Sequence, residues 1–398
     1  MPSYKIKLDN YNLYLSLIYI LWIISLISYP FIDHYIKAGN LIDGVYMGTD
    51  SYSYIIWSNN ILDGTDPILK WKSKFGYLLF LIPFLYFDLP LIYIVFFQIF
   101  LTAVSAWCLY KITTKLFCKL SGVICVALFL FYFPLQMRNF YILTEVLFLD
   151  ISIILTYLIV YFKKTYLPAI IFLIIALISI RPNGILFLFS ILTCFFFFLI
   201  KYKKYLHLSV FLAISLILIF PMLNFLNSYL VDLDLIEGIS NKGVIWGWSL
   251  EKNEYCLSSC LGVELINNNF QNNIFDILRF IWINFIEFYK IFLLKILWLL
   301  LRARPYYSDA HNYYILFFDL IFYLGFIYGF IKRPKNNFSV DVILLYVLYS
   351  ICLVGLTFAD WSGRFSLYFL PFVMIFSSYG VKSLLNLILN FVVKNKRV

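Results

Sequence analysis

The sequence has few charged side chains and very little polar linker. Only 13% of its 398 residues are Asp, Glu, Lys or Arg, whereas 63% are hydrophobic and 21% aromatic, with a mean hydropathy of +0.89. This composition excludes an ordinary soluble domain and is typical of a protein that crosses a membrane several times. The apolar runs are continuous rather than alternating, so we expect an all-α polytopic integral membrane protein.

The sequence also lacks a glycine-rich phosphate loop and any cysteine spacing typical of zinc fingers, so a soluble nucleotide substrate has no support. The net charge of +10 does not indicate a nucleic-acid partner, because the lysines lie in short clusters between apolar runs. We expect no cofactor and no metal site. Asp232 and Asp234 have a spacing that suits a divalent cation, but two solvated acids in a loop or strand explain it better. Asp309 and His311 form an incomplete metal set.

About ten apolar runs approach the 20 residues that a spanning helix needs. They lie at about 12–32, 91–110, 117–134, 143–162, 166–180, 184–200, 206–224, 313–331, 340–358 and 365–388. The basic connectors all fall on one side if the chain starts inside, which predicts cytoplasmic termini in a plasma membrane or bacterial inner membrane. No Ala-x-Ala-like site follows the first span, so we expect a retained signal-anchor.

Two further apolar segments are expected to form interfacial helices on the outer face, although 75–87 could also be re-entrant and 276–301 could also line a wet cavity. Segment 75–87 is too short to span, and segment 276–301 gathers its polar residues on one half of a helix. The chain is therefore divided into a transmembrane module at 1–224, which includes an outer loop at 33–90, an outer-face region at 225–312, and C-terminal helices at 313–398. Cys256 and Cys260 share that outer-face region, where a disulfide and two free thiols remain alternatives.

Most chemically reactive side chains gather on the outer side in this topology. Cations close to a few acids near the membrane surface suit a ligand that carries a phosphate, such as a lipid phosphate. The candidate site residues are Asp50, Tyr54, Lys72, Lys74, Arg138, Glu145, Arg181 and Arg364.

The layout resembles the GT-C glycosyltransferases, and most closely the bacterial branch that uses polyprenyl-phosphate sugars, related to protein mannosyltransferases and lipid A aminoarabinose transferases. Asp50 and Tyr54 lie in the first outer loop after the first span, and Lys74-Phe75-Gly76-Tyr77 precedes an apolar half-helix. The resemblance implies that Asp50 is the catalytic carboxylate and that Lys74 contacts the lipid phosphate. Ser51 and Lys72 stand where many members carry further acids.

Four of these candidates also have a structural explanation. Asp50 follows Gly48-Thr49 and could cap a helix, and Glu145 could interact with the N-terminus of its own helix. Arg181, in a tight turn, could extend to the membrane surface rather than to a bound phosphate. Arg364 could pair with Asp360, four residues earlier.

The expected function is transfer of a sugar from a polyprenyl-phosphate donor to a glycan, lipid or protein acceptor on the outer face, with Asp50 as general base. Asp63 and Asp66 leave glycoside hydrolysis open, because a hydrolase needs a second carboxylate. A surface-polysaccharide polymerase is the main alternative. A lipid-linked-sugar flippase or transporter is disfavoured by the near absence of mid-span charge and of internal repeats.

Overall fold

The computed structural model describes residues 11–36, 41–42, 45–207, 209, 274–304, 307–335, 337–356 and 363–395. Over these residues the protein is a bundle of α-helices with one short hairpin, which confirms the expected all-α membrane class. The first half contains α1 (Tyr11–Ile36), β1 (Leu41–Ile42), β2 (Val45–Tyr46), α2 (Thr49–Leu62), α3 (Leu69–Lys72), α4 (Phe75–Tyr86), α5 (Ile92–Leu116), α6 (Lys119–Leu130), α7 (Phe133–Gln136), η1 (Met137–Phe140), α8 (Thr144–Val160), η2 (Lys164–Tyr166), α9 (Leu167–Ile180), η3 (Pro182–Gly184) and α10 (Ile185–Lys201). The second half contains α14 (Ile274–Ile283), α15 (Phe285–Leu301), α16 (Asp309–Ile331), α17 (Phe338–Leu356), η6 (Arg364–Tyr368) and α18 (Leu370–Asn395).

Six described helical segments are long and apolar enough to cross a membrane, so the expected ten spans are not confirmed. They are Tyr11–Ser28, Ile92–Leu116, Pro182–Lys201, Asp309–Ile331, Phe338–Leu356 and Leu370–Leu387. The expected spans at 143–162 and 166–180 form the helices α8 and α9, with 17 and 14 residues. At 1.5 Å per residue these are about 26 and 21 Å long, shorter than a hydrocarbon core of about 30 Å. The expected span at 206–224 lies almost entirely outside the described residues.

Two predicted helices are interrupted. The segment expected to span at 117–134 ends as α6 at Leu130, and the chain then bends by 61° into the segment Phe133–Phe140. Pro134 explains the break, because a proline at this position has no N–H for the Leu130 carbonyl and its ring would clash with that carbonyl. The predicted interfacial helix at 276–301 divides at Asn284, and both Asn284 and Lys295 are buried, so its polar half does not face water uniformly.

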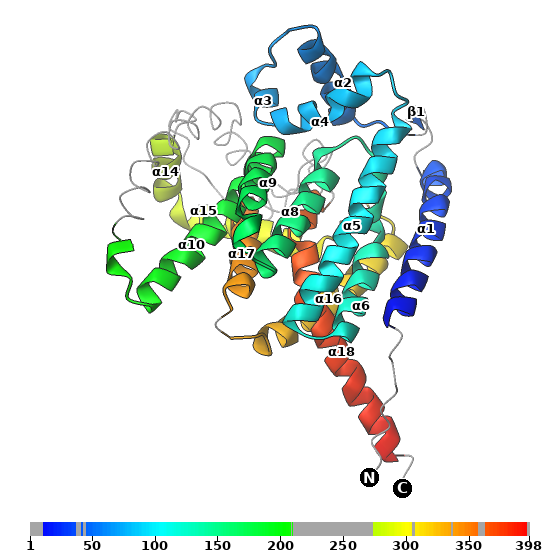
Figure 1. Ribbon diagram of the computed structural model, residues 1–398, viewed down its shortest axis with the longest axis vertical. Helices are drawn as coiled ribbons and strands as arrows, with labels where there is room; N and C mark the ends of the chain where they lie inside the picture. The colour runs from blue at the N-terminus through cyan, green and yellow to red at the C-terminus, as the bar shows by residue number, and fades with distance from the viewer. Residues whose placement is uncertain are drawn as a thin grey trace.

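The helices α2, α3 and α4 form a layer across one end of the bundle, whereas α1 starts and α18 ends at the opposite end (Figure 1). The α5–α6 and α16–α17 connections also lie at that opposite end (Figure 1). Lys115 and Lys119 flank the first connection, and Lys332, Arg333 and Lys335 lie in the second, so two of the expected basic connectors share one end of the bundle. The predicted short helix at 75–87 is present as α4, which is followed by Asp88 with a positive φ of 47°.

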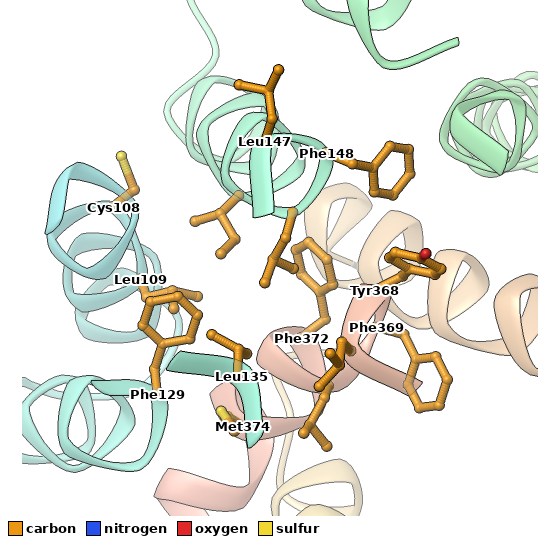
Figure 2. Packing of buried hydrophobic residues seen from close by; sticks show 14 of the residues in the cluster. Cys108, Leu109, Phe129, Leu135, Leu147, Phe148, Tyr368, Phe369, Phe372 and Met374 are labelled. Carbon is orange, nitrogen blue, oxygen red and sulfur yellow. The ribbon is translucent and has the colours of Figure 1, made fainter. Parts of the chain in front are cut away.

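The core lies where α5, α6, α8 and α18 meet. Figure 2 shows Leu109 of α5, Phe129 of α6, Phe148 of α8 and Phe372 of α18 among the buried side chains that fill this space. Lipid tails are as apolar as these side chains, so close packing rather than escape from water must hold such helices together inside a membrane.

Helices α16 and α18 pack in direct backbone contact. A Cβ added to Gly329 would lie 2.1 Å from the Phe376 carbonyl oxygen, and one added to Gly325 would lie 2.7 Å from the Ser377 carbonyl oxygen. On the other helix, a Cβ at Gly380 would lie 2.2 Å from the Gly325 oxygen. Gly325 and Gly329 form a G-x-x-x-G spacing, which lets two helix backbones approach each other directly.

We expect Gly329→Val to lower the free energy of unfolding by about 1–3 kcal/mol or more, because the new side chain would meet backbone that cannot move aside. Thermal unfolding in detergent micelles measures the change. Gly48→Ala is the matched control, since a Cβ there meets only the Ser51 Oγ at 3.9 Å. An unchanged melting temperature for Gly329→Val would contradict the described contact.

Candidate functional site

Asp50 lies in the first turn of α2, where a carboxylate interacts favourably with the helix dipole. It is not the capping residue: Gly48 is the N-cap, and its N–H donates to the Ser51 Oγ at 3.2 Å. The Asp50 side chain instead faces Arg364 and remains 33% exposed. Asp50 is thus an accessible carboxylate at the start of a helix.

A contact between two distant tyrosines holds the start of α2 against the start of α8. Tyr46 forms a parallel β-bridge with Tyr141, and their rings stack with centroids 5.4 Å apart. Tyr46 lies four residues before Asp50, and Tyr141 lies four residues before Glu145. The bridge therefore brings the two acids to the same end of the bundle.

Glu145 is in the first turn of α8 and is almost completely buried, with 2% of its side chain exposed. Its Oε1 atom accepts a hydrogen bond from Arg364 Nε and forms an ion pair with Arg181 Nη1 at 3.1 Å. Arg181 Nη1 also donates to the Thr144 Oγ1 at 2.8 Å. Glu145 thus pairs with two arginines in addition to its favourable position at a helix start.

Arg364 joins both acids. Its Nη1 and Nη2 atoms each donate to Asp50 Oδ2 at 3.1 Å, while Nε donates to Glu145. Arg364 opens η6 directly after Gly363, which has a left-handed φ of 69°. The predicted alternative partner, Asp360, lies outside the described residues.

Arg181 ends α9 and points into this cluster. Its guanidinium carbon is 4.7 Å from the centre of the Tyr368 ring, and its side chain is 11% exposed. Burial raises the pKa of Tyr368, and the positive charge of Arg181 partly offsets that rise. Gly184 keeps the following turn tight, because a Cβ there would lie 2.5 Å from the Leu177 backbone.

Lys74 lies next to the cluster on a support of aromatic rings. Its Nζ atom is 5.3 Å from the centre of the Tyr54 ring and 5.1 Å from that of Trp71. Tyr54 is fully buried, which raises its pKa, and the charges of Arg181 and Asp50 also act on its hydroxyl. Tyr54 is therefore placed to support Lys74 between the layer and the cluster.

The layer is fixed to the bundle close to Arg181. A Cβ added to Gly76 would lie 2.2 Å from the Ser179 Oγ and 2.9 Å from the Ser179 backbone carbon, so α4 touches the end of α9 directly. Lys74 is the N-cap residue of α4, and Arg181 follows Ser179 by two residues. This glycine contact therefore determines how close the lysine and the arginine lie.

Arg138, in η1, is half-buried near Arg364, and the two positive charges oppose each other. Among the described residues no carboxylate pairs with Arg138. Lys72 is exposed at the end of α3 and is not part of the cluster. We name the set Asp50, Glu145, Arg181 and Arg364 the acid–arginine cluster; Arg138 and Lys74 border it.

Sequence reasoning missed the groups that support this cluster. Thr144 accepts from Arg181, Tyr368 lies under the same arginine, and Trp71 lies beside Lys74. Thr144 directly precedes Glu145, and Trp71 is three residues before Lys74, so proximity to the charged residues was the available signal. Sequence proximity did not link Tyr368 to Arg181, because the two residues are far apart in the chain.

The described residues contain no group of three or more His, Cys, Asp or Glu side chains arranged to hold a metal ion. Asp309 and His311 begin α16, where the His311 ring stacks on Tyr307 at 4.3 Å. The pairs Asp232 and Asp234, and Cys256 and Cys260, lie outside the described residues.

Comparison of the chain with protein-family models, with curated proteins and with solved structures finds no match in any of the three. The resemblance to GT-C glycosyltransferases therefore stays a prediction from sequence.

We expect Glu145→Gln to lower the free energy of unfolding by about 3–5 kcal/mol, because it leaves two largely buried arginines without their shared carboxylate. Asp50→Asn should change it by only about 0–1 kcal/mol, since the Asp50 side chain is partly solvated. Thermal unfolding of both variants measures the difference. Glu287→Gln, which breaks the exposed pair with Lys290, is the control and should change stability by about 0.2–0.5 kcal/mol.

Proposed function

We propose that the protein is a membrane glycosyltransferase that moves a sugar from a polyprenyl-phosphate donor to an acceptor hydroxyl on the outer face of the membrane. One observation carries the proposal: Asp50, Glu145, Arg181 and Arg364 converge from four separate segments at one end of the bundle. Together with the bordering Arg138 and Lys74, the cluster contains four cations and two carboxylates. Such a site suits an anionic ligand that meets a carboxylate base.

Asp50 is the proposed base. Of the two carboxylates, Glu145 is buried and pairs with two arginines, whereas a third of the Asp50 side chain is exposed. The acceptor hydroxyl oxygen forms the new bond to the anomeric carbon, and its proton passes to Asp50. At the same time the bond between that carbon and the phosphate oxygen breaks, and polyprenyl phosphate leaves with the electron pair.

The bordering cations are the proposed phosphate contacts. Lys74 stands on aromatic rings beside the cluster, and Arg138 contributes a positive charge near Arg364. Charge that develops on the departing phosphate is stabilised by such fixed cations. Arg364 donates two hydrogen bonds to Asp50, so an incoming phosphate would compete with Asp50 for this arginine and release the base.

The location of the cluster supports the proposed side. It lies by the α2–α4 layer, at the end of the bundle away from the basic α5–α6 and α16–α17 connections (Figure 1). Basic connectors mark the cytoplasmic side of membrane proteins. The cluster would then face the outside, where a lipid-linked donor and a glycan, lipid or protein acceptor meet.

We expect Asp50→Asn to abolish sugar transfer while the protein still accumulates in the membrane, because the amide cannot take the proton of the acceptor hydroxyl. Mass spectrometry of the host's surface glycans in a deletion strain that carries each variant measures this. Asp66→Asn, an exposed acid of the same loop, is the matched control and should restore the glycan.

The same experiment separates the rival functions. Loss of one sugar from otherwise complete glycans, unrestored by Asp50→Asn, supports the transferase. Chains that fall to a single repeat unit would support a polymerase instead. Full complementation by Asp50→Asn would contradict a catalytic Asp50, and a required Asp66 would favour two-carboxylate hydrolysis.

We expect Lys74→Gln to raise the KM for the polyprenyl-phosphate sugar by about 10- to 100-fold, because it removes a charge-assisted contact worth about 1.5–3 kcal/mol. Lys74→Arg keeps the charge and should retain most of the affinity. Donor titration with purified protein in lipid nanodiscs measures both values. Equal KM values for Lys74→Gln and the wild type would contradict the phosphate contact.

A further inference from the structure

A buried polar cluster lies inside the bundle and shares no residue with the acid–arginine cluster. It connects α1, α5, the α7–η1 bend and α8, and no member is more than 1% exposed. We name it the inner polar cluster; its members are Trp22, Gln98, Thr102, Gln136, Asn139 and Asp150. Each hydrogen bond in it has a direction that chemistry fixes.

Donors and acceptors can be assigned along the cluster from Trp22, because its indole nitrogen can only donate. It lies 3.0 Å from Gln136 Oε1, so this atom must be the acceptor oxygen. Gln136 Nε2 lies 2.9 Å from the Phe129 carbonyl oxygen, which can only accept. Two independent partners therefore fix the orientation of the Gln136 amide.

Asn139 is oriented next. Its Nδ2 atom donates to Gln136 Oε1 at 3.2 Å, which turns its Oδ1 atom toward Thr102 Oγ1 at 2.9 Å. An amide oxygen can only accept, so the Thr102 hydroxyl must donate to it. This uses the single proton that a hydroxyl carries.

Thr102 Oγ1 also lies 3.1 Å from Asp150 Oδ2, and it has no proton left for this contact. A second full hydrogen bond at this hydroxyl, rather than one proton shared between two acceptors, requires a proton on the carboxyl oxygen. We infer that Asp150 is a proton-binding site: it is a neutral carboxylic acid in the folded protein and donates its proton to Thr102.

The surroundings of Asp150 support the neutral form. No charged side chain of the described chain lies close enough to act on it; its polar neighbours are Thr102 and Ser105, and its own charge would act on the Cys108 thiol. Asp150 Oδ1 has no hydrogen-bond partner within the described residues. A carboxylate would therefore be buried without a counter-ion, which is strongly unfavourable.

Asp319 shows the opposite arrangement within the same bundle. It is equally buried but forms an ion pair with Arg302, whose Nη1 also donates to the Tyr132 hydroxyl at 2.8 Å. The two buried aspartates thus differ in one respect: Asp319 faces a cation and Asp150 faces a hydroxyl.

The inner polar cluster that contains this proton also supports the candidate site. Asn139 directly follows Arg138, and Gln98 Nε2 donates to the Asn139 and Tyr141 carbonyl oxygens at 2.9 and 3.1 Å. The inner polar cluster therefore fixes the bend that carries Arg138 and the start of the segment that leads to Glu145. Asp150 is a positioning residue for this bend, whether or not the proposed transferase activity is correct.

Infrared spectroscopy of the purified protein at neutral pH, with and without aspartate labelled with ¹³C at the side-chain carboxyl, tests the inference. We expect a carbonyl stretching band of a protonated carboxylic acid that shifts with the label. Asp150→Asn should remove this band and Asp319→Asn should retain it. Absence of the band in the wild-type protein, or its persistence in Asp150→Asn, would overturn the inference.

Thermal unfolding of the same two variants in nanodiscs gives an independent measure. The Asn amide can donate to Thr102 as the neutral acid does, so Asp150→Asn should unfold at the wild-type temperature. Asp319→Asn leaves the buried Arg302 without its counter-ion and should unfold at a clearly lower temperature. A loss of stability in Asp150→Asn as large as in Asp319→Asn would contradict the inference that a neutral donor at this position completes the bond to Thr102.

Discussion

The candidate site depends on one constraint: Glu145 is a charged group that is almost completely buried and must be paired. A buried carboxylate without a partner is strongly unfavourable, and Glu145 meets the requirement with Arg181 and Arg364 from two distant segments. Arg364 in turn holds Asp50, so the charge of one residue in α8 determines where α2, α9 and η6 come together. The accessible carboxylate is thus oriented by groups that are themselves largely shielded from water.

The sequence predicted the members of this cluster but not their pairing. Asp50, Glu145, Arg181 and Arg364 were recognisable as charged groups at the ends of apolar segments on one side of the membrane. Arg364 and Asp50 are 314 positions apart, however, and sequence spacing pointed instead to Asp360. Ion pairs between distant segments depend on how helices pack, and hydrophobic periodicity does not encode this. The break after Leu130 had a local signal in Pro134, whereas the break at Asn284 in the segment expected to lie flat had none as clear.

Glycine residues let helix backbones meet directly at two places in the bundle. The contacts of Gly325, Gly329 and Gly380 join the backbones of α16 and α18 without large side chains between them. Gly76 does the same between α4 and α9 beside the candidate site. Small residues are the means by which helices approach closely in lipid, where apolar side chains gain little by leaving the surrounding medium. The glycine contact at α4 thus gives Lys74 a defined position relative to Arg181 that flexible side-chain packing would not.

The buried acids of this protein are stabilised in two ways, which depend on the groups that surround each acid. Glu145 and Asp319 are stable as charged groups, because each forms an ion pair with the guanidinium of a neighbouring arginine. Asp150 lies among hydroxyls and amides, where a chain of donors that begins at Trp22 leaves only the neutral acid able to complete the last bond. At Glu145 the first arrangement holds charged groups in place at the end of the bundle. The second holds helices together in its interior without introducing any charge, which is what a low-dielectric environment requires.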